Sequence, residues 1–327
     1  MRLLLFIGIC ILTLTACRDD FSLDAPFQDI PVIYAYLNAA DQEHFVRVEK
    51  AFLGTGGNAE IAASTEDSIY YTENAATVTL QSSNGQEFVL ERVNGEDFDL
   101  ERVTGPFIGS PNVLYRTTQN LTGGQPITLT VSRPGEEDAV ATTRLLTEIN
   151  VVQPSEQIVI NNYNQVQNYR WNTSEDARVF DVRMYINIRE FFLSNPDQNR
   201  DRVLEWVLAE NFRPEEMNST VRLSFNNELF WQFLANSLEE DADVVRVMGD
   251  ISFQVTAVGS ELEEKLDIEN ANTGITGSQA LPIYTNVENG LGIFTSRRQA
   301  TVEGIFFANQ NRDTLLNGVY TRNLNFQ

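Results

Sequence analysis

Hydrophobic and polar residues alternate along much of the first half of the chain, in the pattern of strands with one buried face. The segments rich in Val, Ile, Thr and aromatic residues are 32–37, 45–52, 76–81, 87–93, 113–118, 127–132 and 139–146. The residue pairs between them that favour turns are Asn84-Gly85, Asn94-Gly95, Gly123-Gly124 and Pro134-Gly135. Seven short strands separated by turns predict an antiparallel β-sandwich domain over residues 27–150.

A longer alternation occupies residues 178–190 in the second half. Every second residue of this segment is apolar and forms one face of the strand. The series is Phe180, Val182, Met184, Ile186 and Ile188. Trp171 precedes this strand, and the arrangement resembles half of a fibronectin type III sandwich. We therefore predict a mainly β protein of two antiparallel β-sandwich domains, immunoglobulin or fibronectin III-like, with the second domain over residues 151–327.

One segment of the second domain has the periodicity of a helix. Its apolar residues recur at spacings of three and four, in the series Leu229, Phe230, Phe233, Leu234 and Leu238. This spacing predicts a helical insertion around residues 226–240, with Asn226 or Asn227 as its N-cap.

The remaining segments of the second half are less regular. Residues 200–210 fit either a short helix or a strand, and residues 244–258 fit a strand. Residues 260–267 fit one or two helical turns. The tail, residues 283–327, is expected to add two or three strands, some of them packed on the first domain.

The first residues of the chain form a short apolar segment that ends at a cysteine. Arg2 is followed by 13 mostly apolar residues, 3–15, and the segment closes with Leu14-Thr15-Ala16-Cys17. A helix of this length rises only about 20 Å, which is less than a hydrocarbon core of about 30 Å. Residues 1–16 are therefore predicted to be a signal peptide that is removed, and Cys10 is removed with it.

The last four residues of this segment resemble the bacterial lipobox, in which the cysteine thiol receives a lipid before cleavage. We expect Cys17 to be the lipidated first residue of the mature protein, with residues 17–26 as a tether. The alternative is an ordinary secretory signal. Asp19 and Asp20 resemble the short acidic tag that exports some lipoproteins to the cell surface, although a solvated tether explains them equally well.

The composition excludes several classes of protein. The 327 residues include 46 acidic and 23 basic side chains, so the formal net charge is −23 and a general nucleic-acid binder is not expected. His44 is the only histidine, and both cysteines lie within the first 17 residues. Zinc fingers, haem motifs and a disulfide scaffold are therefore excluded.

Two stretches carry a resemblance to a known family. The first consists of residues 24–34 and 44–53, and it contains Pro26-Phe27 and His44-Phe45. The second is residues 283–294, and it contains Gly290-Leu291-Gly292. They resemble an uncharacterised Bacteroidetes-type family of outer-membrane lipoproteins. The resemblance implies an anchored protein of the outer membrane, often associated with TonB-dependent receptors, but it supplies no activity. In physical terms, Gly290 and Gly292 fit places where the chain needs positive φ.

Few residues suggest chemistry. His44 lies in an alternating strand without a catalytic partner motif, so a structural role is expected. The acidic clusters 136–138, 239–243 and 261–267 fit either solvated turns or calcium ligands, although none has the twelve-residue calcium-loop pattern. No catalytic signature is present, and we expect a non-enzymatic protein without metal or cofactor.

Three tryptophans leave two functions open. Trp171, Trp206 and Trp231 fit core positions, but exposed and coplanar they would form a sugar-stacking platform. The leading expectation is an accessory or interaction module beside an outer-membrane nutrient receptor. The alternative is a surface glycan-binding protein of a polysaccharide uptake system, and a hydrolase would need a cleft where carboxylates converge.

Overall fold

The part of the chain that the computed structural model describes, residues 29–51, 59–103, 105–215, 219–272 and 282–327, is mainly β. Its strands form several largely antiparallel sheets. Every helix among these residues is too short or too polar to span a lipid bilayer. The predicted signal peptide, Cys17 and most of the region before β1 lie outside the described residues.

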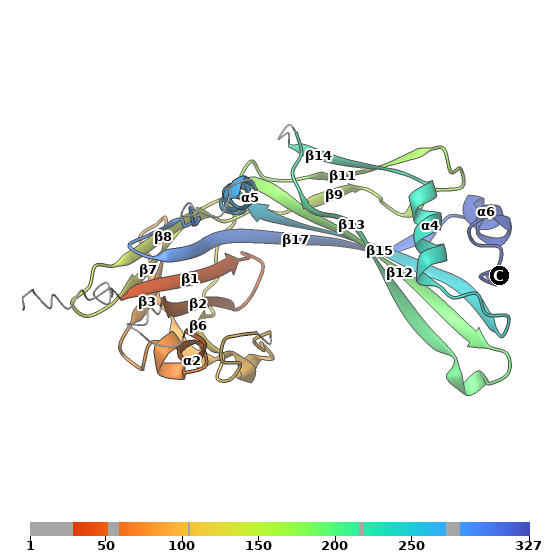
Figure 1. The fold of residues 1–327 in the computed structure, drawn as a ribbon. Helices are drawn as coiled ribbons and strands as arrows, with labels where there is room; N and C mark the ends of the chain where they lie inside the picture. The colour runs from red at the N-terminus through yellow and green to blue at the C-terminus, as the bar shows by residue number, and fades with distance from the viewer. Residues whose placement is uncertain (1–28, 52–58, 104, 216–218, 273–281) are drawn as a thin grey trace, which may run out of the picture.

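A long sheet runs through the whole molecule (Figure 1). Its strand order is β13 (Arg200–Phe212), β12 (Ala177–Phe192), β15 (Val244–Gly259), β17 (Leu291–Phe307), β1 (Ile30–Leu37), β2 (His44–Ala51), β6 (Val113–Thr117) and β5 (Glu91–Asn94), and β10 (Gln157–Ile158) also pairs with β17.

Strand β17 connects the two halves of this sheet. Its first part runs parallel to β1, with Leu291 opposite Val32, and its second part runs antiparallel to β15, with Arg297 opposite Val258. The tail therefore returns to the first half of the chain, as predicted. The close approach to β1 requires glycine at position 292, where φ is +112°.

The N-terminal half encloses its own hydrophobic core. Strands β1, β2 and β6 share buried side chains with a five-stranded sheet of order β16 (Val287–Glu288), β8 (Ala139–Arg144), β7 (Pro126–Ser132), β3 (Thr77–Ser82) and β4 (Glu87–Val89). The segment predicted as one strand over 87–93 is two strands, because the chain changes sheets at the buried Leu90.

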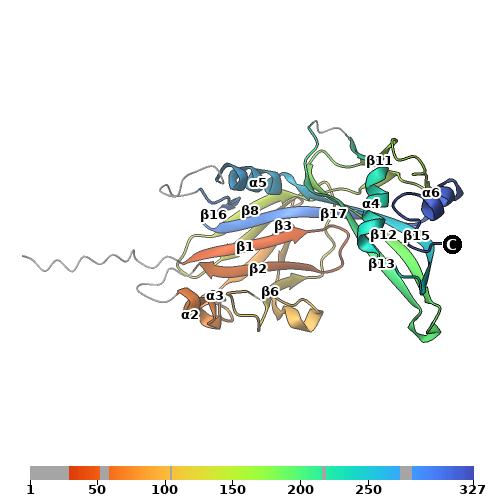
Figure 2. The ribbon, with the colours of Figure 1, turned by 45° about the vertical axis from the view of Figure 1, so that its right-hand side comes forward.

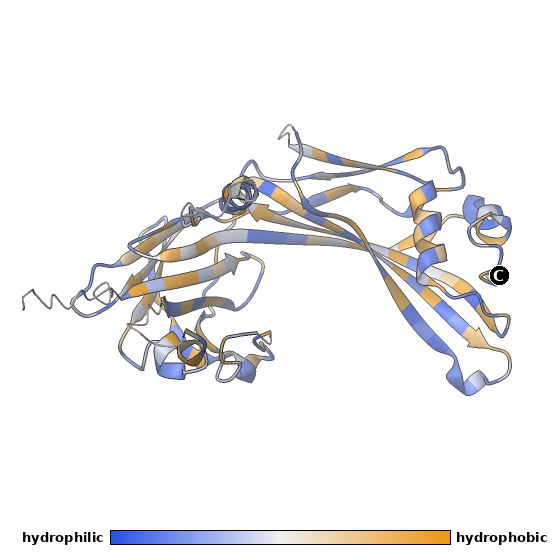
Figure 3. Cartoon of the chain, viewed as in Figure 1, coloured by the Kyte–Doolittle hydropathy of each residue, from blue (hydrophilic) through white to orange (hydrophobic). Residues whose placement is uncertain are grey.

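The C-terminal half has a second core, between the long sheet and a sheet of order β14 (Thr220–Asn226), β11 (Val166–Asn172) and β9 (Asn150–Gln153). The predicted alternation over 178–190 is present in β12, with Phe180, Met184 and Ile188 buried. Figure 3 shows the resulting bands of hydrophobic and hydrophilic residues along the long strands. Residues 200–210 belong to the strand β13.

Helix α4 (Glu228–Ser237) lies within the segment predicted to be helical, and Phe230, Trp231 and Leu234 bury its apolar side. The amide of Glu228 donates to the side chain of Asn226 at 2.9 Å. The other helical segments are α2 (Ala59–Ala63), α3 (Glu66–Ile69), α5 (Ser260–Asn272), α6 (Arg312–Asn317) and the short 3₁₀ turns η1 (Gly95–Phe98), η2 (Pro196–Gln198) and η3 (Asn309–Asn311).

The molecule is elongated (Figure 1). The described chain begins at Asp29, directly before β1, and β1 lies with β2, β3 and β7 at one end (Figure 1). The turn between β12 and β13, helices α4 and α6, and the C-terminus lie at the opposite end in both views (Figures 1 and 2). We call this second end the distal end.

Candidate functional site

A cavity lies at the distal end, and we call it the distal cavity. It has a volume of about 980 Å³ and lies between the β12–β13 hairpin, the end of α4 and the beginning of β15. Its walls combine apolar and charged side chains, including Phe192, Leu238, Arg200, Arg202, Glu190 and Arg246.

Glu190 is the centre of this site. Its side chain is only 1% exposed, and its Oε1 accepts a hydrogen bond from Nε of Arg246 at 2.9 Å. Its Oε2 accepts from Nε of Arg200 at 2.7 Å, and Arg202 lies 3.8 Å away. A single buried carboxylate is therefore surrounded by three guanidinium groups.

The alternation of β12 explains why this carboxylate is buried. Glu190 continues the inward series that ends with Ile188, so it stands where the strand pattern places an apolar residue. On the neighbouring strand, Arg246 lies opposite Glu190 and is also inward-facing. A buried charge is stable only when it is paired and hydrogen-bonded, and these two side chains satisfy one another.

The electrostatic balance at Glu190 favours its charged form. Burial by itself raises the pKa of Glu190, but hydrogen bonds and charge attraction from Arg200 and Arg246 outweigh burial. The pKa of this carboxyl therefore lies below its ordinary value, and Glu190 is an anion at neutral pH. It fits an organiser of the guanidinium groups better than a proton donor.

The two outer arginines are held in different ways. Arg200 lies over the ring of Phe192, with 5.4 Å between its guanidinium carbon and the ring centre, and its side chain is 58% exposed. Arg202 donates from Nη2 to the backbone oxygen of Ser237 at 2.9 Å, which connects β13 to the end of α4. Both arginines line the distal cavity.

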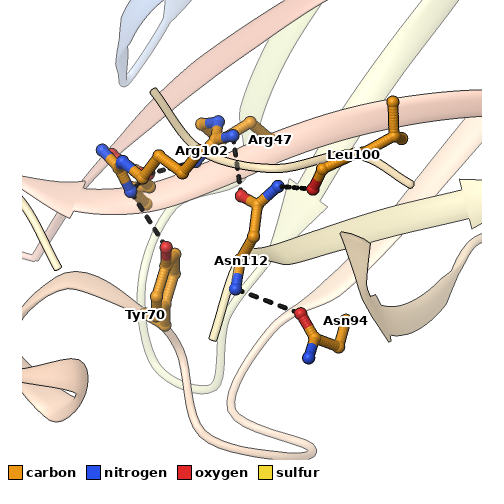
Figure 4. A network of polar contacts seen from close by, with 7 residues as sticks. Arg47, Tyr70, Asn94, Leu100, Arg102 and Asn112 are labelled. Carbon is orange, nitrogen blue, oxygen red and sulfur yellow. Dashed lines mark hydrogen bonds and ion pairs between the residues drawn. The ribbon is translucent and has the colours of Figure 1, made fainter. Parts of the chain in front are cut away.

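A second polar cluster lies on β2, a strand at the other end of the molecule (Figure 1), and is drawn in Figure 4. Glu49 accepts from Nη1 of Arg47 at 3.1 Å and from Nη1 of Arg102 at 2.6 Å. Arg102 also donates to the hydroxyl of Tyr70 at 2.9 Å, and Arg47 donates to Asn112 at 2.8 Å. We call these residues the Glu49 cluster.

The Glu49 cluster joins β2 to the segment that connects β5 to β6. The side chain of Asn112 donates to the backbone oxygen of Leu100 at 2.6 Å. The backbone N–H of Asn112 donates to the side-chain oxygen of Asn94 at 3.1 Å (Figure 4). The contacts therefore hold Asn94, Leu100, Arg102 and Asn112 near β2. A groove of about 440 Å³ lies beside the cluster, and Tyr34 and Phe107 are half-exposed in it.

The three tryptophans are not gathered on one face. Trp171 and Trp231 are fully buried, and Nε1 of Trp231 donates to the backbone oxygen of Ile160 at 2.9 Å. Trp206 is half-buried and stacks on Phe233, with 5.5 Å between ring centres. These residues therefore form core contacts rather than a coplanar sugar-stacking platform.

The other candidate residues are dispersed. His44 is buried in β2, and burial lowers its pKa, so the ring is neutral at pH 7. Among the described residues, no group of three or more His, Cys, Asp or Glu side chains could hold a metal ion. Glu261 accepts from Thr143 and Thr295, each at 2.7 Å, which holds α5 to strands β8 and β17. Cys17 lies outside the described residues.

Of the residues that line the distal cavity, sequence reasoning singled out only Glu239 and Asp241, as part of the acidic cluster 239–243, and it did not identify the buried charges. The available signal was an acidic residue, Glu190, on the apolar phase of an alternating strand, followed closely by Arg200 and Arg202. The partner Arg246 is 56 positions away and is brought to Glu190 only by strand pairing.

No protein-family model matches this chain, and no curated protein sequence matches it. The role of the distal cavity must therefore be inferred from the geometry and chemistry of its own residues.

Proposed function

We propose that this protein is a non-enzymatic lipoprotein of the outer membrane, anchored by lipid on Cys17, that acts as an accessory binding module of a TonB-dependent nutrient receptor. One observation of the fold supports the binding role. The distal cavity is lined by the β12–β13 hairpin and the end of α4. These elements lie at the opposite end of the molecule from β1, the first strand of the described chain (Figure 1). A protein tethered through its first residues would present this cavity away from the lipid.

The structure of the site favours binding over catalysis. The carboxylate of Glu190 is held by two short hydrogen bonds, and the guanidinium groups cannot lose their protons at neutral pH. Such groups recognise charged partners by geometry but do not transfer protons easily.

We also propose that the two hydrophobic clusters are the cores of two immunoglobulin or fibronectin III-like sandwiches, over residues 27–150 and 151–327. Each cluster combines side chains from two sheets, which is the architecture of a sandwich. The first core is completed by Val287 and Phe294 from the tail.

Metabolic labelling tests the anchor directly. The full chain is produced in a Gram-negative host supplied with an alkyne-tagged fatty acid, and we expect label in the wild type and none in Cys17→Ser. Cys10→Ser is the matched control, because that thiol lies in the predicted signal peptide, and it should keep the label. An unmodified mature N-terminus at another residue, found by mass spectrometry, would exclude the proposal.

Photo-crosslinking in intact cells tests the partner. A photoreactive residue at the exposed Asn236, at the end of α4 beside the distal cavity, should crosslink to a TonB-dependent receptor. The same residue at the exposed Glu87, on the first half of the molecule, is the control and should not. Crosslinks to the receptor from neither site would argue against an accessory role.

The alternative function, surface glycan binding, rested on an exposed tryptophan platform. Two of the three tryptophans are fully buried and the third is packed on Phe233. Glycan binding therefore has no support from these residues, and we do not favour it.

A further inference from the structure

We propose that the distal cavity binds a short peptide with a free carboxylate and a free amino group. This inference rests on the proposed binding role and adds the chemical class of the ligand. Three properties of the cavity carry this inference. Arg200 and Arg202, which we call the arginine fork, have unused hydrogen-bond donors. Exposed carboxylates and apolar side chains also line the cavity.

The arginine fork would hold the carboxylate. Within the described chain, the hydrogen bond of Arg200 uses its Nε, so both terminal nitrogens remain available on the exposed side of the guanidinium. Arg202 uses Nη2 for Ser237. The planar guanidinium group presents paired donors at the spacing of the two oxygens of a carboxylate.

Glu190 positions the fork without neutralising it. One buried carboxylate faces three guanidinium groups, and Arg246 is itself buried and also bonded to the backbone oxygen of Leu324 at 2.8 Å. Arg200 and Arg202 are therefore not fully balanced by Glu190. A ligand carboxylate would supply the missing negative charge.

The rim of the cavity would hold the amino group. Glu239 and Asp241 line the cavity and are exposed, and neither forms an ion pair within the described chain. Asp201, the remaining acid of the lining, is already paired with Arg189 at 2.7 Å. Two carboxylates at the rim attract an ammonium group.

The negative charge of the cavity lining and of the whole chain argues against a polyanion as the ligand. The lining contains three arginines and four acids, so its formal sum is 3 − 4 = −1, and the whole chain carries −23. A phosphate-rich ligand would be repelled by the rim and by the long-range field of the protein. A zwitterion meets both signs of charge, with its carboxylate at the arginines and its ammonium at the acids.

The size of the cavity favours a peptide over a single amino acid. Its volume of about 980 Å³ lies near the upper end of the range for small-molecule sites, roughly 300–1,000 Å³. Phe192, Leu238 and Val244 supply apolar surface for the side chains of such a peptide.

Calorimetric titration of the full-length protein in detergent tests this ligand class. The probe is the tripeptide alanyl-leucyl-alanine, compared with its C-terminal amide and its N-acetyl form. We expect saturable binding of the free tripeptide and a loss of at least about tenfold in affinity for the amide, because the charged hydrogen bonds to the arginines are removed. The N-acetyl form should also bind more weakly. These comparisons use the unaltered protein and do not depend on the folding of a variant.

Variants assign the binding to the cavity. Arg200→Gln should lower the affinity for the free tripeptide at least about tenfold and should leave the affinity for its amide unchanged. Arg183→Gln, on the outer face of β12 outside the cavity lining, is the matched control and should bind as the wild type does. Equal binding of the tripeptide and its amide, or no saturable binding, would overturn the proposal. Lipid labelling at Cys17 is measured separately, so this failure is distinguishable from failure of the anchor.

Discussion

Glu190 and Arg246 face each other across β12 and β15 as a buried ion pair, with 2.9 Å between Oε1 and Nε. Both side chains lie on the inward face of the long sheet, where the neighbouring positions are apolar. The pair couples the stability of the distal end to the arrangement of the cavity, since the same carboxylate also orients Arg200.

Glu190→Gln should destabilise the protein by about 3–5 kcal/mol, because Arg246 would remain buried without a counter-charge. Urea unfolding followed by circular dichroism measures the change. The control is Glu205→Gln, which removes one of the two acidic partners of Arg183, Glu205 and Glu210, on the exposed face of the same hairpin. It should cost less than about 1 kcal/mol. Similar losses in both variants would mean that the burial of Glu190 has no energetic role.

The depressed pKa of Glu190 predicts a definite pH dependence. A carboxyl whose pKa is lower in the folded state than in the unfolded chain binds fewer protons when folded, so it stabilises the protein above its ordinary pKa of about 4.3. That contribution disappears as the pH falls through the folded-state value. The free energy of unfolding should therefore fall more steeply below pH 4.3 in the wild type than in Glu190→Gln. Parallel curves for the two proteins would contradict the assignment.

Gly292 is predicted to be irreplaceable. A Cβ at this position would lie 1.9 Å from the backbone oxygen of Ile33, and φ is +112°. Gly292→Ala must therefore push β17 away from β1, and we expect a loss of more than about 2 kcal/mol or failure to fold. Gly109→Ala is the control, because a Cβ there meets no atom within 4 Å. It should change the free energy of unfolding by less than about 1 kcal/mol.

The sequence predicts the strands well because their alternation is local. The segments around β1, β2, β3, β6, β7 and β12 are all present, and the predicted positive φ is found at Gly292, where the chain approaches β1 closely. At Gly290 the structure records no positive φ; there, a Cβ would instead meet Val287 at 2.7 Å. The pairing of β17 with both β1 and β15 is not visible in the sequence, because strand partners are set by contacts between distant segments.

The distal cavity was missed for the same reason. An acidic residue at the inward position 190 conflicts with the pattern of β12, and such conflicts often mark functional or strained sites. The resolution of that conflict depends on Arg246, which no local spacing relates to Glu190. The sequence also left the tryptophans open between core positions and an exposed platform. Trp231, for example, is covered by Tyr163 and Phe307, which no local spacing relates to it.

Fluorescence quenching tests the positions of the tryptophans. Trp171 and Trp231 are fully buried, whereas Trp206 is half-buried at the edge of the core. Acrylamide should therefore quench mainly the emission of Trp206, and Trp206→Phe should remove most of the quenchable signal. Trp171→Phe is the control and should leave it almost unchanged. Strong quenching that persists in Trp206→Phe would show that a buried tryptophan is exposed in solution.

A double-mutant cycle on Arg102 and Glu49 tests how the long connection of residues 94–112 is held. Glu49 is buried and receives Arg102 at 2.6 Å, so we expect a coupling of about 1–3 kcal/mol from Arg102→Gln, Glu49→Gln and the double variant. Arg47 also bonds Glu49, and it limits the loss when Arg102 is removed alone. The matched control is the exposed pair Lys265 and Glu269 on α5, whose coupling should be about 0.3–0.5 kcal/mol. Equal coupling in the two pairs would mean that the connection is held by its apolar contacts, because the buried ion pair would then contribute no more than one on the surface.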